Sequence, residues 1–227
     1  MKVLLIQPPM YHQKVQLSPN LGLASIAAVL ERDGVQVGVL DAAAENLSYA
    51  DILERVRAFQ PRIVGAGGQT PVAPRSMAIF RRIKQEISRD IITIAGGPHF
   101  SFTDHESLEE CRELDIVVRG EGEATISHLC KALETGESLN NVQGITFRDH
   151  NGSIVRNADR EPIADIDSLP FPAWHLFPLD KYHWVGNRLL AISSSRGCPF
   201  RCPYCITWKV HSGVRQRRPA KIVEEMV

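Results

Sequence analysis

The chain has 227 residues, of which 44% are hydrophobic and 23% charged, and its 26 basic and 26 acidic residues leave no net charge. This composition is ordinary for a soluble globular protein with a core. The apolar run before Gln7 is too short for a signal peptide, and no run is long enough to span a membrane, so we expect a cytoplasmic protein. Its five cysteines, three of them clustered, do not resemble a disulfide framework and indicate a reducing compartment.

Short apolar runs alternate with helical periodicity over the first 135 residues. The runs are bounded by Gly, Asp or Pro and predict buried strands at 3–7, 35–41, 62–68, 91–97 and 114–120. Apolar residues at helical spacing lie between them, and the first predicted helix is opened by Ser18 and Pro19 and closed by Gly34. This alternation predicts an α/β fold, a Rossmann-like, doubly wound parallel sheet of five strands in flavodoxin-like order.

The loops that follow the predicted strands carry the residues expected to bind a ligand. A doubly wound sheet binds ligands at the carboxyl ends of its strands, and glycine lets a flat or phosphate-bearing group approach the backbone. Such turns also use glycine for ordinary reasons, but glycines in three of them favour a ligand site. Neither G-x-G-x-x-G in the first turn nor a P-loop lysine occurs, which disfavours NAD and ATP. The expected binding residues are Gln7, Pro8, Pro9, Gly67, Gly68, Gln69, Thr70, Gly96, Gly97, Pro98, Gly120, Glu121 and Gly122.

The later part of the chain reads as a connector followed by the start of a second domain. Residues 142–156 predict a hairpin, and the proline-rich stretch 161–183 predicts an irregular linker whose aromatic residues pack on a domain surface. A buried strand is expected at 188–195 and a helix from 219. The predicted units are therefore 1–140, 141–187 and 188–227.

Three cysteines, Cys198, Cys202 and Cys205, lie within eight residues of "RGCPFRCPYC". Three thiolates can hold a 4Fe–4S cluster and leave one iron open, whereas a structural zinc needs four ligands, and His211 would be the fourth. The spacing and the preceding strand favour the cluster, and the polar, proline-rich loop disfavours three ordinary core cysteines.

The end of the chain that carries these cysteines is also basic. Residues 196–227 hold seven Lys or Arg against two Glu. Nucleic-acid binding is disfavoured, because the basic residues do not alternate with aromatic ones along a platform. The charges either surround an anionic group held by the thiolates or face solvent.

The stretch "SSSRGCPFRCPYC" resembles the signature of the radical S-adenosylmethionine enzymes, and "LLIQPP", "GGPHF" and "VVRGEGEATI" are similar to the cobalamin-binding domain of their cobalamin-dependent members. The linker "LPFPAWHL" also resembles theirs. The resemblance implies that Cys198, Cys202 and Cys205 hold a 4Fe–4S cluster whose open iron binds S-adenosylmethionine, with Tyr204 near the adenine. It also implies that the first domain binds cobalamin.

Two departures from the family pattern affect these expectations. The hexapeptide Asp-x-His-x-x-Gly, whose histidine ligates cobalt in mutase-type domains, does not occur. The lower axial ligand is therefore unassigned: Gln69, Thr70 and the first loop are candidates, and His99 is expected to be a turn residue. A complete TIM-type barrel needs roughly 200 residues, but only the 40 residues 188–227 follow the linker. We therefore expect a C-terminally truncated fragment, inactive alone.

The resemblance implies an enzyme that generates a 5′-deoxyadenosyl radical. Methylation of an unactivated carbon or an oxidative cyclisation is the expected outcome, with electrons from a flavodoxin or ferredoxin. The substrate, a small molecule or a lipid- or tetrapyrrole-like compound, is not specified by the sequence. The alternative is a non-catalytic corrinoid-binding module with a vestigial cysteine segment.

Overall fold

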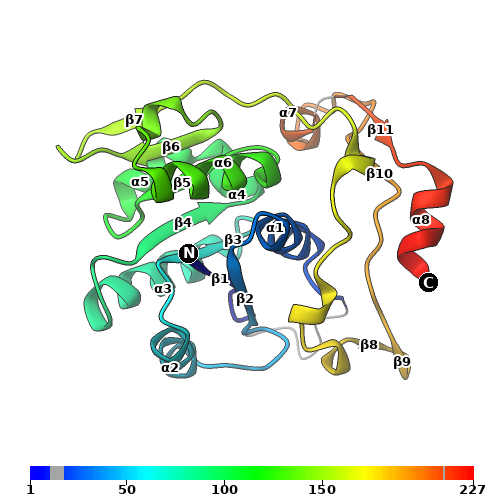
Figure 1. Ribbon diagram of the computed structural model, residues 1–227, viewed down its shortest axis with the longest axis horizontal. Helices are drawn as coiled ribbons and strands as arrows, with labels where there is room; N and C mark the ends of the chain where they lie inside the picture. Colours follow the sequence, from blue (N-terminus) through cyan, green and yellow to red (C-terminus); the bar gives the residue numbers. More distant parts are fainter. Residues whose placement is uncertain (11–17, 212) are drawn as a thin grey trace.

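The computed structural model describes residues 1–10, 18–211 and 213–227. Its main feature is a seven-stranded sheet in the order β2-β1-β3-β4-β5-β6-β7 (Figure 1). The first five strands are parallel, which confirms the predicted flavodoxin-like order: β1 (Lys2–Gln7), β2 (Gln36–Asp41), β3 (Ile63–Gly67), β4 (Ile92–Gly96) and β5 (Ile116–Val118).

Helices cover both faces of the sheet because successive strand residues point to opposite sides. On one face, α1 (Leu21–Arg32) and α6 (Gly122–Thr135) pack on a core that includes Leu5 and Ile94. The opposite face packs against α2 (Tyr49–Phe59), α3 (Ala73–Glu86), α4 (Pro98–Phe102) and α5 (Asp104–Glu110). No helix among the described residues has the length and apolar character needed to cross a membrane.

The first helix begins two residues later than predicted. Asn20, not Ser18, is its N-cap, and the Asn20 Oδ1 atom accepts a hydrogen bond from the Leu23 amide at 3.1 Å. Asn20 also donates through Nδ2 to Gln7 Oε1 at 2.6 Å. The cap is thereby tied to the end of β1, which fixes the start of the helix beside the carboxyl edge of the sheet. The turn beyond the helix contains Gly34, as predicted, in a left-handed conformation with φ of 77°.

The predicted hairpin is present and extends the sheet. Strands β6 (Ile145–Arg148) and β7 (Ile154–Arg156) are antiparallel, and β6 pairs with β5. A short 3₁₀ turn, η1 (Leu139–Asn141), precedes the hairpin.

The linker follows as three 3₁₀ turns, η2 (Ile166–Ser168), η3 (Trp174–Leu176) and η4 (Leu179–Lys181). Trp174 and Phe177 pack against a cluster that includes Ala24 of α1, as expected for the linker aromatics. Tyr182 is fully buried and donates its hydroxyl to Asp41 Oδ2 at 2.7 Å. These contacts fasten the linker to the first part of the chain.

The predicted buried strand at 188–195 is wrong. Only short pairs form here: β8 (His183–Trp184) with β9 (Asn187–Arg188), and β10 (Ser195–Arg196) with β11 (Arg215–Gln216). Leu190 and Ile192 are 50% and 42% exposed. A buried strand needs neighbours on both edges and both faces, whereas in the described part of the chain only the end residues Arg188 and Ser195 of this segment pair with another strand. Two helices follow, α7 (Thr207–Val210) at the top of the view in Figure 1 and α8 (Pro219–Met226) at its right edge.

Candidate cofactor sites

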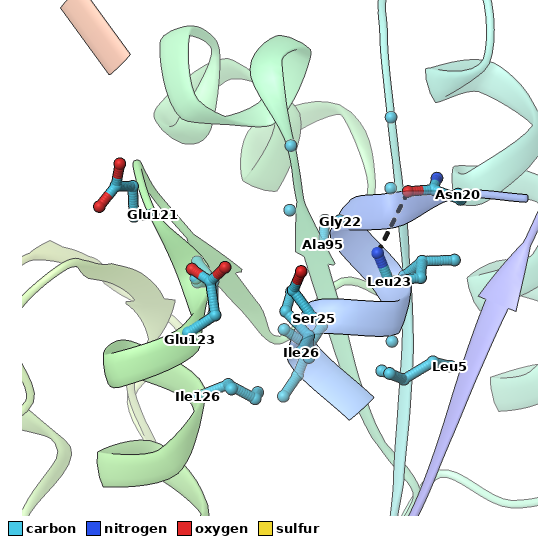
Figure 2. Close-up of a pocket in the computed structure, with 18 of the residues that line it drawn as sticks. Leu5, Asn20, Gly22, Leu23, Ser25, Ile26, Ala95, Glu121, Glu123 and Ile126 are labelled. Atoms are coloured by element: carbon cyan, nitrogen blue, oxygen red, sulfur yellow. Dashed lines mark hydrogen bonds between the residues drawn. The ribbon is translucent and has the colours of Figure 1, made fainter. Parts of the chain in front are cut away.

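A cavity of about 390 Å³ opens at the carboxyl edge of the sheet, between α1 and α6. Figure 2 shows Ile26 of α1 and Ile126 of α6 on its opposite sides, with Leu5 toward its floor. The floor consists of apolar strand residues on the α1 and α6 face, and the rim consists of the glycine-containing loops. The lining residues thus combine an apolar interior with exposed backbone groups, as ligand sites commonly do.

Missing side chains create much of this space. A Cβ atom built at Gly65 would lie 2.9 Å from Leu5 Cδ2, and one at Gly67 would lie 2.1 Å from the Gly96 carbonyl oxygen. At Gly97, φ is 89°, a conformation that favours glycine. The strand ends can approach one another only because no Cβ intervenes, and the cavity reaches the sheet because β3 carries no side chain at position 65.

The structure brings most of the predicted binding residues together. The cavity is lined by Gly67, Gly68, Gly96, Gly97, Pro98, Gly120, Glu121 and Gly122. Gln7 does not line the cavity; its side chain is buried and accepts a hydrogen bond from Asn20 Nδ2. Pro8 and Pro9 follow β1, and Gln69 and Thr70 precede α3, without lining the cavity.

His99 and Thr70 are neighbours outside the cavity wall. The His99 Nδ1 atom lies 3.2 Å from Thr70 Oγ1, and the His99 ring meets Phe100 edge-on. His99 is the second residue of α4 and so lies in a helix rather than in a turn; that it does not ligate cobalt stays a prediction. Part of the first loop, residues 11–17, lies outside the described residues, so that candidate for an axial ligand stays a prediction.

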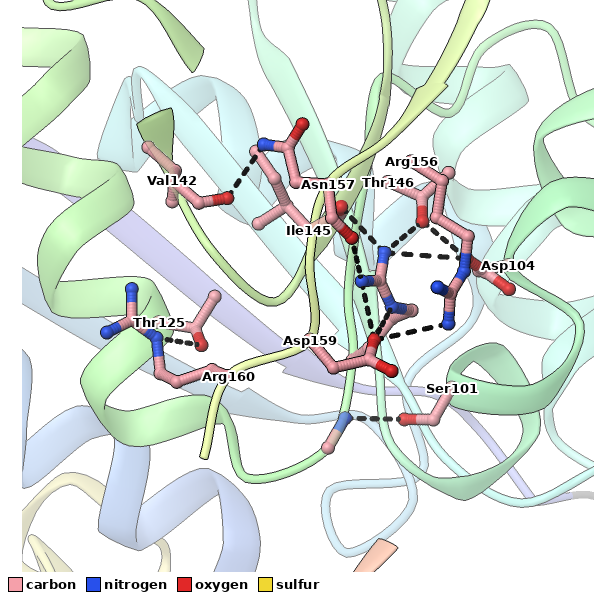
Figure 3. Close-up of polar contacts among 12 residues, drawn as sticks. Ser101, Asp104, Thr125, Val142, Ile145, Thr146, Arg156, Asn157, Asp159 and Arg160 are labelled. Atoms are coloured by element: carbon pink, nitrogen blue, oxygen red, sulfur yellow. Dashed lines mark hydrogen bonds and ion pairs between the residues drawn. The ribbon is translucent and has the colours of Figure 1, made fainter. Parts of the chain in front are cut away.

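A buried arginine fixes the loop that supplies Gly120, Glu121 and Gly122. Arg119 is 4% exposed and donates to Asp159 Oδ1 at 2.7 Å and to the Ile145 carbonyl oxygen at 2.6 Å. Asp104 accepts from Arg156 Nε at 3.0 Å within the same network (Figure 3). Because each buried charge has a partner, the network holds β5 against the hairpin.

The same loop is held from a second side. The Gly120 amide donates to the Ser101 hydroxyl at 3.1 Å. Since Ser101 belongs to α4, the loop after β5 is fixed to the helix that follows β4. Both loops line the cavity, and this contact sets their separation.

Sequence reasoning did not find the role of Glu121 and Glu123. The Glu121 side chain is 3% exposed and accepts hydrogen bonds from His211 Nδ1 at 2.9 Å and from both Arg215 Nη atoms at 2.6 and 2.9 Å. Glu123 accepts from Arg196 Nη2 at 2.5 Å. Burial raises the pKa of Glu121, but the hydrogen bonds from His211 and Arg215 outweigh it and hold that pKa well below its usual range. The available signal was the acidic "EGE" at residues 121–123 and the excess of basic residues near the end.

The three clustered cysteines lie between β10 and β11 and are each partly exposed. The Cys205 amide donates to the Cys202 carbonyl oxygen at 3.0 Å, and hydrogen bonding with the Thr207 side chain and backbone lowers the pKa of the Cys205 thiol. Within the described ranges, no three His, Cys, Asp or Glu side chains are gathered closely enough to hold a metal ion. Tyr204 is 90% exposed.

The remaining cysteines are core residues. Cys111 and Cys130 are buried, and burial raises the pKa of both thiols, that of Cys130 to about 12. They differ in environment from the partly exposed cysteines of the loop, as the sequence pattern indicated.

The chain is similar in sequence to curated proteins over its whole length. An uncharacterized methyltransferase of Pyrococcus horikoshii is 33% identical over the whole chain, which covers 50% of that protein. The anaerobic magnesium-protoporphyrin IX monomethyl ester cyclase of Rubrivivax gelatinosus is 32% identical, and the chain covers 42% of it. The chain thus spans about half the length of these curated relatives.

A solved structure shares the fold. The radical S-adenosylmethionine methyltransferase TsrM of Kitasatospora setae, with cobalamin and a [4Fe-4S] cluster bound, superimposes with a TM-score of 0.73 over 99% of this chain and 45% of its own, at 20% identity. These matches confirm the fold that the resemblance implied. The B12 binding domain model matches residues 15–130, which is more than half of the 227 residues, and the chain therefore belongs to the B12-binding domain family.

Proposed function

We propose that the chain binds cobalamin in the cavity between α1 and α6 and forms the first part of a radical S-adenosylmethionine enzyme. The observation that carries the proposal is the glycine-framed cavity at the carboxyl edge of the sheet, most of whose lining residues belong to the segment that matches the B12-binding family. This is the edge at which doubly wound sheets bind their ligands.

The residues of the cavity fit a cobalamin molecule. The apolar floor formed by Leu5, Ile94 and Val118 suits a flat aromatic base, and a cavity of about 390 Å³ accommodates such an end group rather than a whole corrin. We therefore place the base in the cavity and the corrin outside it, against the glycine loops. Ser25 and Asn20 are the polar side chains of α1 and its cap that line the same space and can meet the sugar or phosphate.

The cysteine loop fits an iron–sulfur cluster in its donor chemistry. Cys198, Cys202 and Cys205 supply three thiols, and the lowered pKa of Cys205 favours the thiolate that ligates iron. The loop has to draw the three sulfur atoms together when a cluster assembles. When bound, the cluster supplies an electron to S-adenosylmethionine, and cobalamin supplies a methyl carrier. Tyr204, exposed beside Cys205, is free to meet the adenine.

The reaction proposed for the whole protein is methylation of an unactivated carbon or an oxidative cyclisation. The relatives bear methyltransferase and cyclase names, and the cyclases act on a magnesium-protoporphyrin ester by name. A tetrapyrrole-like substrate, a flavodoxin or ferredoxin as electron donor and a cytoplasmic location are parts of the same proposal. The second candidate, a corrinoid-binding module without a cluster, is favoured by the finding that the described metal-ligating side chains are not gathered.

Anaerobic reconstitution of the full chain with iron and sulfide separates the two candidates. We expect one 4Fe–4S cluster per chain by iron and sulfide analysis and by its absorption and paramagnetic resonance spectra. Replacement of Cys198, Cys202 or Cys205 by alanine should abolish the cluster, whereas the matched controls Cys111→Ala and Cys130→Ala should retain it.

Two results would contradict the enzymatic proposal. The first is a wild-type chain that assembles no cluster, which would support the corrinoid-binding module. The second is one zinc per chain that is released by His211→Ala, which would assign the cysteines to a structural zinc site.

A further inference from the structure

Two carboxylates of the first part of the chain face the base of the cysteine loop. Strands β10 and β11 pair so that Arg196 lies opposite Arg215, which brings two guanidinium groups to the point where the loop leaves the body of the protein. The Arg215 guanidinium meets Glu121 and the Arg196 guanidinium meets Glu123. The repulsion between the two arginines is therefore offset by carboxylates from the loop that follows β5.

These ion pairs are buried and geometrically specific. The Glu121 and Glu123 side chains are 3% and 6% exposed. Glu121 binds Arg215 through both carboxylate oxygens and also accepts from the Ile163 amide at 2.8 Å. Two parallel hydrogen bonds fix the relative orientation of both groups, and the loss of one partner from a buried pair is strongly unfavourable. Glu121 therefore defines one docked position for the segment.

The docked segment forms part of the cavity wall. Ser193, Arg196 and His211 line the cavity together with the glycine loops of the sheet. His211 contacts the Glu121 carboxylate directly, so the carboxylate that binds Arg215 also fixes the position of His211 in the cavity wall. A molecule in the cavity touches the segment only while the ion pairs hold it in position.

We propose that Glu121 and Glu123 are positioning residues that hold the cysteine-bearing segment, residues 193–211 and 213–215, against the cobalamin cavity, so that cobalamin binding and docking of the segment stabilise each other. The proposal rests on the proposed function, since it requires cobalamin in the cavity. By thermodynamic linkage, the factor by which cobalamin favours the docked segment equals the factor by which docking raises cobalamin affinity. If the glutamates have a merely structural role, docking and cobalamin binding are not coupled, and both factors equal one.

The test uses the full chain and two measurements, the dissociation constant for hydroxocobalamin and the rate of trypsin cleavage after Arg215. The Arg215 side chain is 14% exposed and held by Glu121, so trypsin reaches it only when the segment undocks. For the wild type we expect saturating hydroxocobalamin to slow cleavage by at least about fivefold, the lower end of typical coupling between sites. In Glu121→Gln the protection should fall below about twofold, with a matching loss of affinity.

Asp167→Asn is the matched control. Asp167 also anchors the C-terminal segment, since its Oδ2 atom accepts from the Arg218 amide at 3.0 Å and from Arg218 Nε at 2.8 Å, but it does not line the cavity. This variant should keep both the protection by hydroxocobalamin and the wild-type affinity. Circular dichroism establishes that each variant is folded, and Glu123→Gln, which removes only the Arg196 pair, takes the place of Glu121→Gln if the latter does not fold.

The outcomes separate this inference from the function on which it rests. A wild-type chain that does not bind hydroxocobalamin contradicts the proposed function. A chain that binds it without any change in cleavage after Arg215 overturns the inference alone. Full protection in the folded Glu121→Gln or Glu123→Gln variant, or an equal loss in Asp167→Asn, overturns it as well.

Discussion

Gly67 and Gly96 are partners in neighbouring strands and both line the cavity, yet they differ in what a methyl group would meet. A Cβ at Gly67 would lie 2.1 Å from the Gly96 carbonyl oxygen, so one strand end has to move by about 1 Å to reach an acceptable contact. That movement also breaks the hydrogen bond from the Gly68 amide to the Gly96 carbonyl oxygen, which measures 3.0 Å. A Cβ at Gly96 would lie at an ordinary 3.6 Å from the Val118 carbonyl oxygen.

We expect Gly67→Ala to lower the free energy of unfolding by about 2–4 kcal/mol, of which overpacking contributes about 1–3 and the lost hydrogen bond about 1. For a chain of this size the melting temperature should fall by about 4–16 °C. Gly96→Ala should change the free energy of unfolding by less than about 1 kcal/mol, because alanine fits and restricts the unfolded chain. Urea denaturation followed by circular dichroism measures both. Equal stabilities for the two variants would refute the reasoning.

Three further predictions concern buried polar groups and the cobalt site. The pKa of Glu121 is depressed in the folded chain, so its contribution to stability is present above pH 4.5 and shrinks as the pH falls below that value. In Glu121→Gln the urea midpoint should therefore depend less on pH below 4.5, and a pH profile identical to that of the wild type would contradict this. Tyr182→Phe removes the donor to buried Asp41 and should cost about 1–3 kcal/mol in urea denaturation, whereas wild-type stability would show that the contact contributes nothing. Paramagnetic resonance of bound cob(II)alamin should show no nitrogen coupling from a protein imidazole, and such coupling, lost in His99→Ala, would make His99 the axial ligand.

The sheet was predictable from the sequence because its strands are buried on both faces and bounded by glycine. Val3 to Ile6 and Ile63 to Ala66 are apolar at every position or carry glycine, and this pattern identifies central parallel strands without any knowledge of their partners. The glycine-containing turns predicted the edge at which a ligand binds, because a doubly wound sheet binds its ligands at the carboxyl ends of the strands.

The errors arose where the structure depends on contacts distant in the sequence. The run 188–195 is apolar enough for a buried strand, but among the described residues only its ends, Arg188 and Ser195, pair with another strand, and Leu190 stays half-exposed. Asn20 replaces Ser18 as the helix cap because its side chain also reaches Gln7, a contact that local cap preferences do not contain. The pairing of Glu121 with Arg215 spans 94 positions and was invisible to motif reasoning.

The central claim, that cobalamin occupies the cavity between α1 and α6, is tested most directly by hydroxocobalamin titration of Gly65→Val beside Gly38→Val. Both substitutions place a branched side chain on a parallel strand next to a leucine, Leu5 at 2.9 Å for Gly65 and Leu4 at 3.1 Å for Gly38, but only Gly65 lines the cavity. Filling the cavity floor should weaken binding by at least about tenfold in folded Gly65→Val, while Gly38→Val should bind like the wild type. Equal affinity for all three proteins would place cobalamin elsewhere and contradict the account.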